Sequence, residues 1–476
     1  MLTKCKLVFL LGLICFSAIF ADEDTEIKFK KANVFYEFGN IVNAVELDLD
    51  TMENQWTQRF GGKFDLEAHR GDNLSLYFGA GTIFWHAIPE IATQTNTQVF
   101  YGDGLLTKAY AHYKFGDPDE PVVDLKLGAI PVRYSMSRNL GEYMFRTGTY
   151  PCYIITGNPF TTVNVAGAMV LGTQLNHNIS EMFSHSLFFT SERSSFPLHD
   201  FSLTYMANLN TPIIKAGFGL QLNRLIPVKP SKTTPTLEKN KYFKYEGEWY
   251  TSNLEYYRFN SMGSKTAGDT ATSLMWDSTR AFVDSLLDLW DTNTVTKPTM
   301  EKFTFQGIKP VLTASIDFGA IIGSDIIRKD EFVLYTEGVL MGIKDYPIFY
   351  EKASERIAWM AGINIPTFGL LTTLNAEVEY YPSPYVNGYR TAREGKRPHP
   401  DFDYKKIDGY NPDDWTSDDL KWSIFLDREI TKGVAFQAQI ASDHLRGRRG
   451  SRVVSENSIL VDESHWYYMA KIDISL

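Results

Sequence analysis

Apolar and polar residues alternate with a period of two over most of the chain, and this pattern limits what the chain can fold into. In residues 63–69 (KFDLEAH), every second side chain is apolar, from Phe64 to Ala68. Because successive side chains of a β-strand point to opposite faces of a sheet, the pattern predicts strands with one apolar and one polar face. The same alternation occurs in residues 108–115, 122–129, 374–380 and 470–476.

The connections between the predicted strands alternate in length. The gaps at one end, such as 69–73 and 116–121, carry tight-turn residues, whereas the gaps at the other end include the long loops 135–160, 227–301 and 382–419. Short turns at one end and long loops at the other are typical of transmembrane barrels of the bacterial outer membrane. The sequence therefore predicts an all-β fold, a transmembrane antiparallel β-barrel of about 16 strands within a range of about 14–18. Its first strand is expected at 41–49.

The N-terminus has the pattern of a secretory signal. Lys4 and Lys6 precede an apolar run, and small residues stand near a predicted cut after Ala21. Residues 1–21 are then a signal peptide, 22–40 a periplasmic lead-in or the start of the first strand, and 41–476 a single barrel domain. An uncleaved anchor and a lipoprotein cut at Cys15 are the alternatives.

Composition excludes several classes of protein. Removing the signal takes the net charge from −10 to −12, which argues against general nucleic-acid binding. Only Cys152 lies outside the signal, so the mature monomer has no internal disulfide and needs another source of stability. The aromatic content of 14% fits the interfacial girdles of membrane barrels.

The C-terminal strand carries a resemblance to a known class. Residues 467–476 (YYMAKIDISL) are similar to the terminal assembly signal of Gram-negative porin-type barrels, although that class usually ends in Phe or Trp and this chain ends in Leu476. The whole mature chain resembles that class. The resemblance implies an outer-membrane location, a water-filled lumen, passive diffusion of ions or small hydrophilic solutes, and no cofactor. The resemblance is compatible with a homo-oligomer but does not require one.

In sixteen-stranded porins, which this chain resembles in pattern, the third outer loop folds inward and narrows the pore. Here that loop is 135–160. Ser137 or Asn139 is expected to cap a short helix in which Arg138, Glu142 and Arg146, spaced i, i+4 and i+8, share one face. Opposed charges in a constriction would set ion selectivity. The alternative is a solvated loop with one helix-stabilising ion pair.

Charged residues on the polar faces of the strands are expected to line the lumen. Both signs occur among them, so they indicate no preference for anions or cations. The solvent face of a soluble sheet is the alternative. These residues are Lys63, Asp65, Glu67, Asp124, Lys126, Arg133, Asp317, Glu377, Glu379, Lys471 and Asp473.

Two outer loops carry charge clusters of opposite sign. The basic cluster Arg446, Arg448, Arg449 and Arg452 suits the phosphates of outer-leaflet lipopolysaccharide, with a solvated loop as the alternative. Asp401, Asp403 and Asp408 are weak candidates for Ca²⁺ ligands. Their spacing lacks the glycine of a calcium loop, which favours a solvated acidic loop and no metal.

The loop 227–301 is too long to be structureless. Its first half is rich in Tyr and Trp, and residues 269–290 have the apolar stripe of an amphipathic helix. Packing of this loop as a lid or a subunit contact is favoured over the stacking of sugars on its aromatic rings.

Enzyme motifs are missing from the sequence, which has no G-x-S-x-G, H-E-x-x-H or phosphate-binding loop. The sequence therefore predicts a non-enzymatic channel whose partners are outer-membrane lipid, lipopolysaccharide and small hydrophilic solutes. A barrel hydrolase, a plugged or structural barrel and a secreted carbohydrate-binding β protein are the alternatives.

Overall fold

The protein is described from a computed structural model. The described residues are 25–45, 51–86, 100–149, 168–192, 200–227, 242–245, 248–251, 256–257, 306–323, 326–327, 329–343, 353–382, 419–443, 448–449, 452–453 and 464–476.

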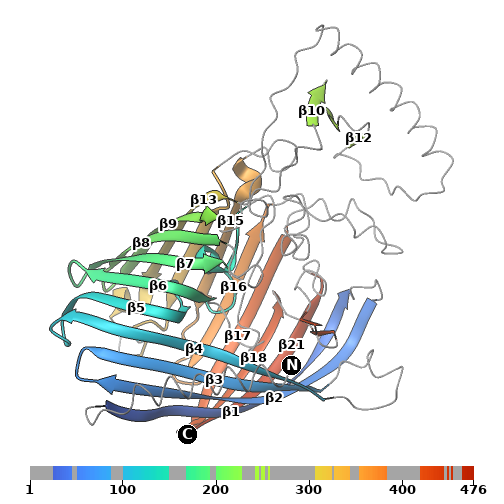
Figure 1. The fold of residues 1–476 in the computed structure, drawn as a ribbon. Coiled ribbons are helices and arrows are strands. Elements are labelled where there is room, and N and C mark those ends of the chain that lie inside the picture. The colour runs from blue at the N-terminus through green and yellow to red at the C-terminus, as the bar shows by residue number, and fades with distance from the viewer. Residues whose placement is uncertain are drawn as a thin grey trace.

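Sixteen antiparallel strands form one closed barrel (Figure 1). The ring closes where β1 pairs with β21, and Figure 1 shows the blue first strand beside the red last strand. The strands of the ring are β1 (Thr25–Val45), β2 (Thr51–Arg70), β3 (Leu74–His86), β4 (Phe100–Gly116), β5 (Pro121–Val132), β6 (Ala168–Asn178), β7 (Phe183–Glu192), β8 (Asp200–Asn210), β9 (Ile214–Pro227), β13 (Gly307–Asp317), β14 (Val333–Leu340), β15 (Ile357–Asn364), β16 (Thr373–Tyr381), β17 (Asp419–Thr431), β18 (Val434–Ser442) and β21 (Trp466–Ser475).

The remaining elements lie in the connections. A three-stranded sheet contains β10 (Tyr242–Tyr245), β11 (Glu248–Thr251) and β12 (Tyr256–Tyr257), and a two-stranded sheet contains β19 (Arg448–Arg449) and β20 (Arg452–Val453). The helices are α3 (Tyr143–Arg146), α6 (Phe318–Ile322) and the 3-10 turn η2 (Ala353–Arg356). No helix in the described part of the chain combines the length and the apolar character needed to cross a membrane.

The two faces of the barrel wall follow the period-two pattern. In β14, Val333 and Tyr335 are buried on the inner face, while Leu334 between them is 45% exposed on the outer face. In β21, Ile472 and Ile474 are exposed on the outside. A closed ring leaves no edge strand with unpaired main-chain groups, and its apolar outer face suits contact with lipid.

The turn chemistry and the alternation of connection lengths match the expected barrel. Gly71, at a φ of 60°, takes the left-handed conformation in the short turn between β2 and β3. The side-chain amide of Asn73 ties that turn to β4 by donating a hydrogen bond of 2.7 Å to the carbonyl oxygen of Lys114. The expected count of about 16 strands is confirmed by the sixteen in the ring.

The first strand lies earlier than expected. The strand expected at 41–49 begins at Thr25 as β1, so residues 25–40 are the start of the first strand, one of the two expectations for 22–40, and not a periplasmic lead-in. The pairing of β1 with β2 shifts between Phe29 and Lys31. The bulge interrupts the alternation at residue 30. Further along, Phe35 is buried on the inner face between the exposed Val34 and Tyr36, so apolar residues occupy both faces and no alternation is visible.

Several predicted segments lie outside the described residues. They are the signal peptide 1–21, the segment 269–290 with its expected helix, and the acidic candidates Asp401, Asp403 and Asp408. Arg446 is also outside the described residues, whereas the main chains of Arg448, Arg449 and Arg452 lie in β19 and β20.

Candidate constriction site

The chain that follows β5 runs inside the barrel. Residues 133–149, named the inner segment here, contact inward-facing side chains of strands on several sides of the ring. Lys309 of β13, Glu377 of β16 and Asp443, which follows β18, all bond to this segment. A segment reaches the inner faces of such separate strands only by crossing the enclosed space.

Three buried carboxylates hold the main chain of the inner segment. Six consecutive main-chain N–H groups, from Arg138 to Tyr143, donate hydrogen bonds to Glu337, Glu377 and Glu379. The N–H groups of residues 139 and 140 both lie 2.9 Å from Glu377 Oε2. That of residue 141 lies 2.7 Å from Glu379 Oε2, and those of residues 142 and 143 lie 2.8 Å from the Glu337 oxygens.

The backbone conformation of the inner segment explains how so many N–H groups converge. Gly141 and Glu142 both have left-handed φ values, 71° and 58°. Successive residues in such conformations turn their N–H groups into one concavity that binds anions. The anions here belong to the protein itself, because Glu337 in β14 and Glu379 in β16 lie in one row across β15.

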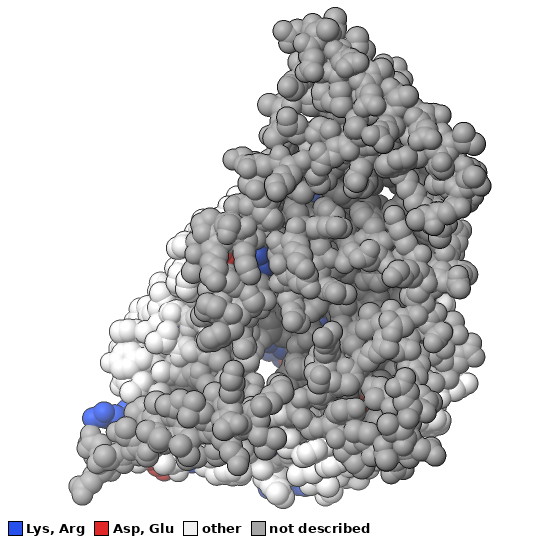
Figure 2. Space-filling view, turned by 45° about the vertical axis from the view of Figure 1, so that its right-hand side comes forward, with Lys and Arg blue, Asp and Glu red and all other residues white. Residues whose placement is uncertain are grey.

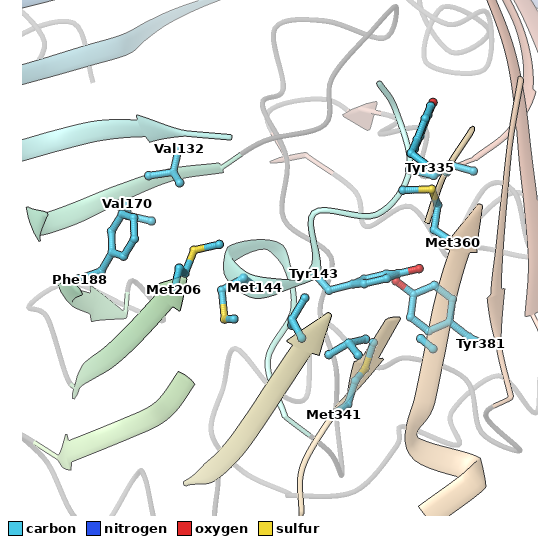
Figure 3. Packing of buried hydrophobic residues seen from close by; sticks show 14 of the residues in the cluster. Val132, Tyr143, Met144, Val170, Phe188, Met206, Tyr335, Met341, Met360 and Tyr381 are labelled. Carbon is cyan, nitrogen blue, oxygen red and sulfur yellow. The ribbon is translucent and has the colours of Figure 1, made fainter. Parts of the chain in front are cut away.

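The other side of the inner segment is apolar. Figure 3 shows Tyr143 and Met144 of α3 between two parts of the inner wall, one carrying Val170, Phe188 and Met206 and the other Tyr335, Met360 and Tyr381. The Tyr143 and Tyr381 rings meet edge to face, with centroids 5.9 Å apart. Gly219 in β9 leaves room for Met144, because a Cβ at that position would overlap the Met144 methyl group.

Cationic side chains satisfy the carbonyl groups at the end of α3. Lys309 Nζ is fully buried and donates to the carbonyl oxygens of Tyr143 (3.0 Å), Met144 (2.8 Å) and Thr147. Arg146 donates 2.6 Å to the carbonyl oxygen of Gly141. Lys309 therefore anchors the α3 part of the inner segment to the wall by charge-assisted hydrogen bonds, and Arg146 closes the segment on itself.

The prediction that Arg138, Glu142 and Arg146 share one face of a helix is wrong. The helix α3 spans only residues 143–146, and its N-cap is Glu142 with no side-chain cap, not Ser137 or Asn139. The carboxylates of the barrel wall hold residues 138–143 in a bent, partly left-handed path, which excludes the longer helix. The three charged residues therefore do not share one helical face.

The structure gives those three residues separate surroundings. Arg138 donates 3.1 Å to Thr373 Oγ1 and lies over the Phe425 ring, whose centroid is 5.4 Å from the guanidinium carbon. Glu142 accepts from the N–H group of Ser135 at 2.8 Å. Arg146 is buried among carbonyl groups, so only Arg138 of the three retains partial exposure. A role of these residues in a constriction stays a prediction.

Burial shapes the titration of the inner segment. It raises the pKa of the Glu142 carboxyl, against the hydrogen bonds from Ser135 and the attraction of Arg133. Burial, together with the like charge of Arg133, lowers the pKa of the Arg138 guanidinium. Guanidinium groups stay charged at neutral pH, so Arg133 and Arg138 bring two positive charges close together.

The predicted lumen-lining residues lie on the inner face of the barrel, and most acids among them are paired. Asp65 lies 3.0 Å from Lys108, Asp124 lies 2.9 Å from His112, and Asp473 lies 3.0 Å from Lys471. Glu67 lies 2.8 Å from Lys30. Glu377 and Glu379 hold the inner segment, and Asp317 also caps α6 by accepting from Ala320 N.

Lys63 and Arg133 remain exposed on this inner face, and Lys126 is half-buried. Figure 2 shows a hollow on one face of the molecule with blue Lys or Arg atoms inside it. A lining role in conduction stays a prediction for all of these residues.

The sequence analysis missed Glu337, Lys309, Gly141 and Asp443. Glu337 is the one acid in the otherwise apolar strand VLYTEGVL, which was a usable signal for an inward carboxylate with a partner. Asp443 Oδ2 accepts from Tyr467 Oη at 2.8 Å and from the side-chain amide of Asn139. That contact had no local sequence signal.

Comparisons with known proteins give distant structural likenesses only. No protein-family model matches the chain, and no curated protein matches its sequence. The chain is similar to OprB of Pseudomonas putida at 11% identity, with 94% of each chain covered and a TM-score of 0.46. It is also similar to a triple mutant of the Rhodopseudomonas blastica porin at 10% identity, with 95% of this chain and 100% of that chain covered and a TM-score of 0.37. These values are too low to assign the chain to a family.

Proposed function

We propose that the protein is an outer-membrane channel through which ions and small hydrophilic solutes diffuse passively. The observation that carries the proposal is the pairing of a closed sixteen-strand ring with an apolar outer face and a charged inner face. Such a ring satisfies its main-chain groups in lipid and encloses a polar path.

The inner segment sets the bore of the proposed channel. It crosses the enclosed space and packs on the inner faces of β13, β14 and β16. The strands β1–β3 contribute no side chain to the buried cluster around α3 and would then form the free wall of the path, with the exposed Lys63 in β2.

No catalytic step belongs to the proposal. The clustered carboxylates Glu337, Glu377 and Glu379 hold main-chain N–H groups, which fixes their position and occupies their oxygens. The proposal has two further parts. The arginines of β19 and β20, among them Arg448 and Arg452, bind lipopolysaccharide phosphates, and the barrel assembles into a homo-oligomer.

Solute flux into vesicles tests the function. Vesicles that contain the purified full chain should swell in solutions of small neutral solutes, at rates that fall steeply as the solute grows. Protein-free vesicles are the control. Insertion of the chain without any swelling would contradict an open path and favour a plugged or structural barrel.

A further inference from the structure

We propose that the channel prefers anions, with Lys63, Lys126, Arg133 and Arg138 as the side chains that set this preference. The inference deepens the proposed function and rests on it. Its basis is the unequal pairing of charges on the inner face.

The acids of the inner face have bound donors. Those on the free wall form ion pairs or hydrogen bonds at 2.8–3.0 Å, for example Glu67 with Lys30 and Asp65 with Lys108. Those on the opposite side, such as Glu337 and Glu377, accept main-chain N–H groups of the inner segment. Because donors of the protein occupy these oxygens, little carboxylate surface is open to a passing cation.

Three cations have no such partner. Among the ion pairs of the described residues, none contains Lys63, Lys126 or Arg133. Lys63 lies within electrostatic reach of Asp65 and Asp473 but also of further lysines. Lys126 lies within electrostatic reach of Asp124, whose carboxylate contacts His112 at 2.9 Å. Arg133 is exposed, and its guanidinium donates to the carbonyl oxygen of Ser137. The acid that attracts it, Glu142, is buried and accepts main-chain N–H groups.

The inner segment adds a second arginine where the path is narrowed. Arg138 is partly exposed, and its guanidinium contacts the Thr373 hydroxyl and the Phe425 ring, neither of which carries charge. Asp427 and Glu377 attract it and Arg133 repels it. The free cations therefore occur both on the wall and on the segment that narrows the path.

This local charge opposes the charge of the whole chain, which is −10. Low-dielectric walls focus the field of the charges that line a cleft, so the local groups decide which ions enter. A unit charge about 7 Å from a monovalent ion in water changes the ion's Boltzmann weight by about e-fold, before screening. With a Debye length of about 10 Å at 0.1 M salt, each free cation should change the anion-to-cation permeability ratio about two-fold.

The reversal potential of the full chain in planar bilayers, under a potassium chloride gradient, tests the inference. The wild type should show the sign of chloride preference. The substitutions Lys63→Gln, Lys126→Gln and Arg133→Gln should each lower the permeability ratio about two-fold, and the triple variant about eight-fold, with discrete channels retained. Lys432→Gln, in the turn between β17 and β18, makes the same charge change outside the lumen and should leave the ratio unchanged.

The outcomes separate the two proposals. A wild type that conducts but is cation-selective or non-selective overturns the anion preference and leaves the channel function standing. A triple variant that conducts with the wild-type ratio overturns the assignment to these side chains. A chain that inserts without conducting removes the channel function, and the inference with it.

Discussion

Replacing Glu377 with glutamine tests whether the wall carboxylates hold the inner segment. Glu377 accepts from the main-chain N–H groups of Arg138, Asn139 and Leu140 and from Tyr335 Oη. Each of its two oxygens accepts two of these bonds. A glutamine side chain keeps one acceptor oxygen and turns the other into an NH₂ group that faces donors. If the NH₂ group faces residues 139 and 140, two hydrogen bonds are lost. If it faces Arg138 and Tyr335, the bond from Arg138 is lost, because the Tyr335 hydroxyl can turn to accept.

The expected loss of anchoring free energy is large for the replacement of one oxygen by an NH₂ group. Hydrogen bonds to a charged group contribute about 1.5–3 kcal/mol each, so one or two lost bonds weaken the anchoring by about 1.5–6 kcal/mol. Since about 1.4 kcal/mol corresponds to a tenfold change in an equilibrium constant, the ratio of displaced to anchored segment should rise by about one to four orders of magnitude.

Single-channel recording measures this displacement. Glu377→Gln should give frequent transitions to larger conductance levels, because the segment that narrows the path leaves its place part of the time. Glu429→Gln, at the exposed end of β17, makes the same change outside the anchoring site and should record as the wild type. A Glu377→Gln channel with wild-type current level and noise, and an intact β-sheet signal by circular dichroism, would refute the anchoring role.

Three further changes test the fold and the inner segment by equilibrium unfolding from vesicles. Gly141→Ala places a Cβ at a φ of 71° and should lower the unfolding free energy by about 1–2 kcal/mol, whereas Gly338→Ala, in open space, should change it little. Lys309→Met leaves the carbonyl groups at the end of α3 without their donor and should cost about 2 kcal/mol or more. Leu312→Arg, at an outer position with 62% exposure, should cost about 2–4 kcal/mol, and Leu370→Arg, in the turn between β15 and β16, about 1 kcal/mol at most. Equal costs at the two leucine positions would contradict a lipid-facing band.

The barrel was predictable because its wall has a period that the sequence repeats. In β16, Leu374, Ala376 and Val378 face outward while Glu377 and Glu379 are buried inside, as the alternation in that segment predicts. Connection lengths supplied the second constraint, since they alternate along the whole ring. Local pattern therefore determined the class of fold and the strand number.

The alternating pattern did not predict the strands in two situations: where a bulge shifts the register, and where apolar residues occupy both faces of a strand. In β1, a bulge interrupts the alternation near Lys31, and the inward Phe35 is apolar like its outward neighbours Val34 and Tyr36. In β14, apolar residues such as Val333 and Tyr335 also face inward, because the inner segment covers them. An inner face of this kind has no polar alternation to detect.

The inner segment was only partly predictable for a different reason. A resemblance in pattern indicated that the loop after β5 folds inward, and the structure places residues 133–149 inside the ring. Its path depends on carboxylates about two hundred positions later in the chain, as the pairing of Glu142 N with Glu337 shows. A helical spacing of Arg138 and Arg146 carries no information about such partners, so the expected helical face was wrong.

The conductance of the purified full chain in a planar lipid bilayer tests the central claim most directly. We predict stable, discrete openings of one main size, because the ring is closed and the inner segment is held in one place by Glu337, Glu377 and Glu379. A chain that inserts with the circular dichroism of a β-barrel and passes no current would contradict the claim that the enclosed path is open.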